Sequence, residues 1–133
     1  MIEIRKLSKS FEAQQVLDHL DLTINAGETM VVIGRSGCGK SVLLKHIIGL
    51  MRPDEGSVVV DGVDVPQLSG QSLDRLRLKI GMLFQSAALF DSMTVEENVG
   101  FSLQEHTTMS AEAIRKRVGE CLQLVGLEGV EEL

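Results

Sequence analysis

The sequence predicts an α/β fold in which a buried strand and a glycine-rich loop lead into a helix, beside an antiparallel β-subdomain. Two observations carry this prediction. The first is the apolar run Met30–Ile33, followed by the glycine-rich stretch Gly34–Ser41 and the aliphatic segment Val42–Ile48. Such an unbroken run is typical of a parallel strand buried on both faces. The second is Asp61-Gly62 between two valine-rich runs, one of the strongest short signals for a hairpin.

The other elements of the N-terminal half follow from local patterns. Ile2–Phe11 is expected to form a strand, and the alternation of apolar and polar residues over Leu20–Ile24 predicts a half-exposed strand. A turn at Asn25–Glu28 follows it. Gly49 and Pro53 are a plausible stop for the helix after the glycine-rich loop. Leu68–Leu78 is expected to be a helix, and Ile80–Phe84 a second buried strand.

The C-terminal half is predicted to be helical. Residues 86–93 form a loop, and Thr94 with Glu97 has the spacing of a capping box, which starts a helix. Ser110 is expected to cap the last helix, while Arg115, Lys116 and Glu120 form a solvated face. The opposite, apolar face of that helix is expected to contain Ile114, Val118, Cys121, Leu122 and Val125.

Composition indicates one globular domain at most. The chain has 133 residues, of which 44% are hydrophobic, and its net charge of -6 includes no basic block, so no nucleic-acid partner is indicated. Cys38 and Cys121 have neither metal nor redox spacing, and His19, His46 and His106 share no ligand spacing. The start of the chain has no signal-peptide character, and no apolar run approaches transmembrane length. We therefore expect a reducing compartment, and a chain that is either soluble or associated with a membrane only through a partner.

The stretch Gly34–Ser41 fits the phosphate-loop pattern G-x-x-x-x-G-K-[ST] without deviation. Glycines at 34, 37 and 39 allow backbone conformations in which successive N–H groups point at an anion. The helix that begins near Lys40 adds the positive end of its dipole. Lys40 supplies a charge for the outer phosphates, and the Ser41 hydroxyl suits a Mg²⁺ ligand position. The alternative is a turn that merely connects a strand to a helix, but the full motif favours nucleotide binding.

Four features together resemble the nucleotide-binding domains of ABC (ATP-binding cassette) proteins. Phe11 stands where these domains carry an aromatic residue that stacks on adenine, and Gly34–Ser41 resembles their Walker A motif. The segment Pro53–Gly62 looks like their antiparallel hairpin, and Ile80–Gln85 looks like the strand that enters their Q-loop. The resemblance implies a P-loop NTPase core with an antiparallel β-subdomain, and ATP with Mg²⁺ as cofactors.

The resemblance also implies roles for individual residues. Lys40 and Gln85 would be catalytic, with Gln85 joining Ser41 at the Mg²⁺ and sensing the attacking water; the alternative for Gln85 is a surface glutamine. Phe11, followed by Val16, would contact adenine, although Phe11 could be an ordinary core aromatic. Val42 would add a contact at the helix start. Backbone N–H groups would come from the loop residues Ser36, Gly37, Cys38 and Gly39. The Cys38 thiol, beside Lys40 and a helix N-terminus, is expected to be sensitive to alkylation.

A finer resemblance concerns the segment Leu83–Val99, which is similar to the ATPase subunits of MCE-associated lipid transporters of the Mla type. It implies a peripheral protein on the cytoplasmic side of the inner membrane that powers phospholipid transport. Its partners would be a second nucleotide-binding subunit, an MCE-type protein, and permease subunits that dock on the loop after Gln85. Residues 87–90 would form this exposed docking loop, unless they pack under the helical segment.

The family's signature sequence, Walker B aspartate, catalytic glutamate and switch histidine all follow the Q-loop, and none of them occurs in these 133 residues. Leu68-Ser69-Gly70-Gln71 only mimics the signature, because it precedes the Q-loop and lacks the second glycine. Residues 1–133 are therefore expected to be the N-terminal part of a single nucleotide-binding domain. Two alternatives stay open, namely an ABC protein without a transport role and a nucleotide-binding fragment without catalytic competence.

Overall fold

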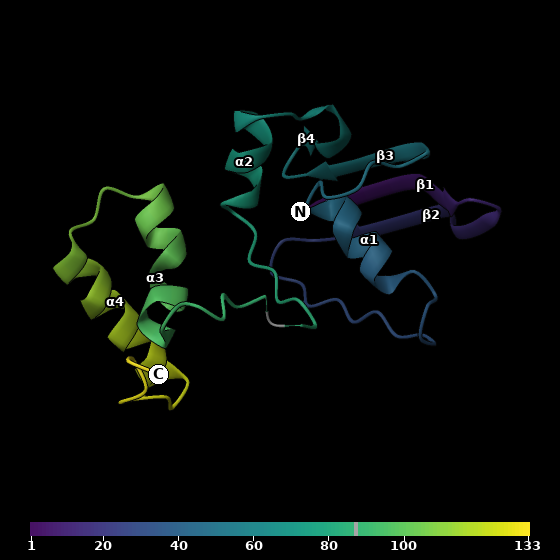
Figure 1. Ribbon diagram of the computed structural model, residues 1–133. Helices are drawn as coiled ribbons and strands as arrows, with labels where there is room; N and C mark the ends of the chain where they lie inside the picture. Colours follow the sequence, from purple (N-terminus) through teal and green to yellow (C-terminus); the bar gives the residue numbers. More distant parts are fainter. Residues whose placement is uncertain (87) are drawn as a thin grey trace. The chain divides into compact units, whose positions relative to one another are not determined.

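A computed structural model of the chain describes residues 1–86 and 88–133 (Figure 1). The chain divides into two compact units, Met1–Met82 and Leu83–Leu133, and each unit is described by itself. Ala87, which the sequence placed in an exposed docking loop, lies outside the described residues. The predicted elements that the structure confirms include the strands of the antiparallel sheet and the first helix of the N-terminal unit.

The N-terminal unit contains a four-stranded antiparallel sheet in the order β2-β1-β3-β4. Its strands are β1 (Ile2–Phe11), β2 (Gln14–Ile24), β3 (Glu55–Val60) and β4 (Val63–Asp64). The hairpin predicted from Asp61-Gly62 joins β3 to β4, and both turn residues have positive φ angles, 49° and 79°. This combination is the one that a two-residue type I′ turn requires, which explains why Asp-Gly is placed there. The predictions for these strands are confirmed.

Helix α1 (Lys40–Ile47) contributes one face to the core of this unit, whereas the sequence suggested a mostly buried helix. Leu44 is 48% exposed on the opposite face. The helix ends as predicted at Gly49, whose φ is +68°: its N–H donates to the His46 carbonyl (3.1 Å), and the N–H of Leu50 donates to the Lys45 carbonyl (2.8 Å). These two bonds form a Schellman motif. The buried core comprises Ile4, Leu7, Leu17, Leu43, Ile47, Val58, Val60, Val65 and Leu76.

Two predicted strands are not formed. Met30–Ile33 and Ile80–Phe84 contain no strand in the described chain, and Ile33 and Leu83 are 87% and 91% exposed. A parallel strand buried on both faces needs a hydrogen-bonded neighbour on each side. No segment within residues 1–86 and 88–133 pairs with either run. The apolar runs are present in the sequence, but the partners that would turn them into strands are not among the described residues.

The helix predicted for Leu68–Leu78 is shorter than expected. A 3₁₀ turn, η1 (Val65–Gln67), precedes extended backbone at Leu68, and α2 runs over Gln71–Arg77. The helix starts late because Gly70, its N-cap, has a backbone conformation (φ 51°, ψ -134°) outside the helical region. The Arg77 guanidinium then donates to the carbonyls of Ile48 (3.2 Å) and Gly49 (3.0 Å), and so satisfies acceptors at the end of α1.

The C-terminal unit is a pair of helices, α3 (Val95–His106) and α4 (Ala111–Leu124). The capping box is confirmed: the Glu97 N–H donates to Thr94 Oγ1 (3.2 Å), and the Thr94 N–H donates to Glu97 Oε2 (2.8 Å). Ser110 caps α4 through the Ala113 N–H (3.3 Å). Of the predicted apolar face, Ile114, Val118 and Leu122 are buried and Cys121 is partly buried. Val125 is 67% exposed because it lies at the C-cap, where the helical periodicity has ended.

Asn98 fastens the loop before α3 to that helix. Its Oδ1 accepts from the Phe90 N–H (2.8 Å), while its Nδ2 donates to the carbonyls of Phe90 (3.1 Å), Met93 (3.1 Å) and Thr94 (3.0 Å). The Phe90 ring also packs on Phe101, with 4.8 Å between centroids, although Phe90 remains 47% exposed. The loop therefore combines both alternatives from the sequence: it is exposed, and Phe90 packs on the helical segment.

Replacing Asn98 with alanine is expected to lower the free energy of unfolding of the C-terminal unit by about 1–3 kcal/mol, because four hydrogen bonds are lost and the Met93 carbonyl and the Phe90 N–H lose their partner. Hydrogen exchange of the Phe90 amide is expected to accelerate. Ser102→Ala, an exposed change on the same helix, is the control. Equal exchange rates of the Phe90 amide in the two variants would show that the Asn98 side chain does not hold the loop.

Candidate functional site

The glycine-rich loop lies between the extended segment that follows β2 and the start of α1. Gly37 and Gly39 both have positive φ angles, +78° and +96°, which side chains disfavour. Gly39 is the N-cap of α1, and no side chain in the described chain caps this helix end. The N–H groups of the first turn, from Lys40 to Val42, have no intrahelical acceptor. They are therefore available to an anion, together with the positive end of the helix dipole.

Strand β2 packs directly against this loop. A Cβ added to Gly39 would lie 3.0 Å from Val16 Cγ1, 3.1 Å from Leu17 Cδ2 and 3.1 Å from the Val16 carbonyl oxygen. The structure thus brings Val16 next to the loop, and its contact with adenine stays a prediction. Gly39 has two independent reasons to be glycine, since its conformation is left-handed and its surroundings have no space for a side chain.

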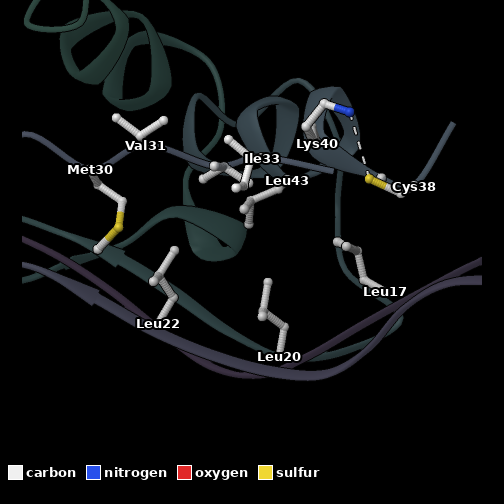
Figure 2. Close-up of a pocket in the computed structure, with 11 residues that line it drawn as sticks. Leu17, Leu20, Leu22, Met30, Val31, Ile33, Cys38, Lys40 and Leu43 are labelled. Atoms are coloured by element: carbon white, nitrogen blue, oxygen red, sulfur yellow. Dashed lines mark hydrogen bonds between the residues drawn. The ribbon is translucent and has the colours of Figure 1, made fainter. Parts of the chain in front are cut away.

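The Lys40 side chain folds back over the loop. Its Nζ donates to the carbonyls of Gly34 (2.9 Å) and Arg35 (2.7 Å), and lies 3.6 Å from Cys38 Sγ. Figure 2 shows the Lys40–Cys38 contact at one end of a cavity. The ammonium therefore lies at the loop itself, where it can exchange carbonyl acceptors for phosphate oxygens. Cys38 is exposed, and its sensitivity to alkylation stays a prediction.

The cavity beside the loop has a volume of about 430 Å³ and is mostly apolar (Figure 2). Leucines of β2 form one wall, and residues of the extended segment form another. An apolar wall does not suit a triphosphate, because desolvating charged oxygens there would be costly. The N–H groups of the loop, and not the cavity, are thus the candidate phosphate site. The cavity is lined by Leu17, Leu20, Leu22, Met30, Val31, Val32, Ile33, Cys38, Gly39, Lys40 and Leu43.

The remaining predicted residues lie in different places. Phe11 ends β1 and is 42% exposed, so its ring is open to a ligand. Ser36 and Ser41 are exposed on the loop and at the start of α1. Gln85 is exposed at a turn of the C-terminal unit, and its role at the Mg²⁺ stays a prediction. The sequence did not indicate Lys9, whose Nζ lies near the Phe11 ring, or Asp54, which bonds to Lys9 and to the Ser10 N–H. The one available signal was the position of Lys9, two residues before the aromatic residue.

Two negative findings apply to the described residues. No group of three or more His, Cys, Asp or Glu side chains among residues 1–86 and 88–133 could hold a metal ion. In the same part of the chain, no helix combines the length and apolar character that crossing a bilayer requires.

The pattern G-x-x-x-x-G-K-[ST] at residues 34–41, in a loop that leads into helix α1, is characteristic of the phosphate-loop class of nucleotide-binding proteins. A family model described as "ABC transporter" matches residues 17–132. The chain belongs to the ABC transporter family. The prediction of an ABC nucleotide-binding domain is confirmed at this level.

Individual relatives agree with the family. The "Probable ribonucleotide transport ATP-binding protein mkl" of Mycobacterium leprae is 47% identical over 131 residues, which cover 98% of this chain and 38% of the relative. "Protein TRIGALACTOSYLDIACYLGLYCEROL 3, chloroplastic" of Arabidopsis thaliana is 46% identical over 132 residues, again 98% and 38%. The chain thus spans well under half the length of these curated relatives.

Among solved structures, a dimeric ATP-binding cassette in a post-hydrolysis state, bound to ADP and Pi, superposes with a TM-score of 0.90. It is 33% identical, and the match covers 99% of this chain and 61% of that one. The fold prediction is therefore confirmed, including its statement that the chain contains an incomplete cassette domain.

Replacing Gly39 with alanine is expected to destabilise the N-terminal unit by about 1–3 kcal/mol, through left-handed strain and the contact with Val16. Urea unfolding measures this loss. Gly119→Ala in α4 is the matched control, because a Cβ there meets nothing within 4 Å and alanine favours the helix. A Gly39→Ala midpoint at or above that of the unmodified chain would contradict the packing described for this loop.

Proposed function

We propose that this chain binds Mg-ATP at residues 34–42 and forms the ATP-binding part of an ABC transporter ATPase. The observation that supports this most directly is the loop itself. Gly39 caps α1 in a left-handed conformation, three first-turn N–H groups are without intrahelical acceptors, and the Lys40 ammonium lies across the loop. In this proposal the β- and γ-phosphates replace the Gly34 and Arg35 carbonyls as the acceptors of Lys40.

The other residues follow from this placement. N–H groups of Ser36, Gly37, Cys38 and Gly39 would surround the phosphates, and the Ser41 hydroxyl would be a ligand to the Mg²⁺. Val42 contributes at the helix start, while Phe11 and Val16 contact the adenine. Phosphoryl transfer depends mainly on positioning and charge neutralisation. These residues supply part of both, and bound Mg²⁺ supplies the neutralisation of the phosphate oxygens.

Efficient hydrolysis is assigned to a larger assembly. None of the 133 residues supplies the family's signature, Walker B aspartate or catalytic glutamate. We therefore expect this chain to bind ATP with little turnover. A dimeric cassette with 33% identity supports the proposal that two nucleotide-binding subunits associate in the active protein. Permease subunits would dock on the loop after Gln85, which places the protein on the cytoplasmic side of the inner membrane.

The ATP proposal is tested by calorimetric titration of the chain with ATP and Mg²⁺. Lys40→Ala is expected to weaken binding at least about tenfold, because a charged donor to the outer phosphates is lost, and tenfold corresponds to about 1.4 kcal/mol. Lys45→Ala is the control, since Lys45 is exposed on the same helix. Absence of binding by the unmodified chain, or equal binding by Lys40→Ala, would rule the site out.

For the cargo, we propose phospholipid. The support is the similarity of Leu83–Val99 to ATPases of MCE-associated transporters, together with a relative whose name contains that of a glycolipid. A relative named for ribonucleotide transport points to a different cargo. The two cargoes are chemically distinct, so a transport assay separates them directly.

In vesicles that contain the larger ATPase assembly, which supplies the catalytic residues, with its permease and MCE-type protein, we expect ATP-dependent transfer of a fluorescent phospholipid. The Lys40→Ala variant is expected to abolish transfer. ATP-dependent movement of a labelled ribonucleotide without lipid transfer contradicts the phospholipid proposal. A pull-down in which no permease binds the ATPase favours instead an ABC protein without a transport role.

A further inference from the structure

Asp54 connects the end of β1 to the segment that precedes β3. Its Oδ1 lies 2.6 Å from Lys9 Nζ, and its Oδ2 accepts from the Ser10 N–H at 2.7 Å. The Asp54 N–H in turn donates to the Ser8 carbonyl (3.0 Å). One residue thus makes three bonds to consecutive residues of the strand, 8, 9 and 10. Hydrogen bonds from Lys9 and then from the Ser10 N–H lower the pKa of the Asp54 carboxyl, so this carboxyl is ionised at neutral pH.

These bonds hold a segment whose pairing is irregular. In the β1–β2 ladder the register shifts on both sides of Lys9, between Leu7 and Lys9 and again between Lys9 and Ser10. Irregularities of this kind in a strand redirect the side chains that follow. Ser8, 7% exposed, adds a bond by accepting from the His19 N–H (3.0 Å). The strand end is still paired with β2, Ser10 with Gln15 and Phe11 with Gln14, and specific side-chain bonds hold it in addition.

The residue at the end of this strand is Phe11. Lys9 Nζ lies 5.8 Å from the centroid of the Phe11 ring, within the range of a cation–π contact. The Lys9 side chain is only 17% exposed, which is low for a lysine at the surface, and Asp54 explains where its charge is neutralised. The ring itself is 42% exposed and is open to a ligand. Lys9 is thus held between a carboxylate and an aromatic ring.

We propose that Lys9 and Asp54 are positioning residues for the adenine base: together they hold Phe11 as a pre-oriented stacking platform, and the base stacks on the ring face away from Lys9. This inference rests on the proposed ATP site. Stacking on an aromatic side chain strengthens the binding of a base when the platform is already in place. A ring that must be ordered on binding loses part of that gain, because fixing a side chain costs conformational entropy.

The alternative is that the ion pair only stabilises the sheet at the end of β1. The two readings differ in which part of the nucleotide is affected. If the pair is purely structural, its loss weakens contacts with the base no more than contacts with the phosphates. A pair that orients Phe11 weakens ATP binding but leaves binding of inorganic tripolyphosphate, which has no base, unchanged.

The experiment compares the affinities of the full chain for Mg-ATP and for Mg-tripolyphosphate by calorimetry. In Lys9→Met, which retains the stem but not the charge, and in Asp54→Asn, the ratio of the two affinities is expected to fall about two- to fivefold, as a cation–π contact predicts. Lys9→Arg is expected to retain the ratio. Arg5→Met is the matched control, because it breaks the Arg5–Glu3 pair (2.6 Å), an ion pair elsewhere on β1.

A second arm tests whether the pair acts through Phe11. In a Phe11→Ala background, Lys9→Met is expected to cause no further change in the ratio. The inference is overturned if ATP binds in a Lys40-dependent manner but Lys9→Met and Asp54→Asn leave the ratio unchanged. It is also overturned if Lys9→Met lowers the ratio equally with and without Phe11. Lack of ATP binding by the unmodified chain overturns the ATP site itself, and that outcome is distinct from both.

Discussion

The contact between Gly39 and strand β2 is the constraint on which the candidate site depends. Because Gly39 has no side chain, the Val16 carbonyl and the Leu17 side chain can approach the start of α1 closely. That approach places the core residues Leu43 and Ile47 of the helix against the sheet, and the Schellman motif at Gly49 ends the helix directly after Ile47. The same residue begins α1 without a side-chain cap, so the first N–H groups of the helix have no intrahelical acceptor. Folding of this unit and availability of an anion site therefore have one common cause.

Electrostatics at the loop follows from the same geometry. The N-terminus of α1 and the Lys40 ammonium place positive charge at one point in a chain whose net charge is -6. The ammonium is held by loop carbonyls, which are neutral acceptors and weaker partners than phosphate oxygens. Near the end of β1, Asp54 neutralises Lys9 and so keeps that second cation beside the Phe11 ring. Two lysines thus have different surroundings, one with carbonyl acceptors and one with a carboxylate partner.

The C-terminal unit uses a different principle to order its loop. Asn98 presents its amide to the backbone of residues 90, 93 and 94, so one side chain provides the bonds that sheet pairing provides elsewhere. Gly100 lets α3 approach α4, since a Cβ there would lie 3.1 Å from Ile114 Cγ2. Asn98 thus orders residues 90–94, which belong to the loop where the proposed function has the permease subunits dock. Thr94 and Ser110 also cap α3 and α4, each through a bond to a residue three positions further on.

The sequence by itself determined those features of this protein that depend on local chemistry. The Asp-Gly turn, the capping box of Thr94 and Glu97, the stop at Gly49 and the phosphate-loop motif are all read over a few residues, because each depends on backbone conformations of neighbouring positions. The tertiary structure decided what depends on distant partners. The apolar runs at 30–33 and 80–84 form no strands, since a strand exists only with a hydrogen-bonded neighbour. The bonds of Asp54 to residues 8–10 were likewise hidden, because 44 positions separate Asp54 from Ser10.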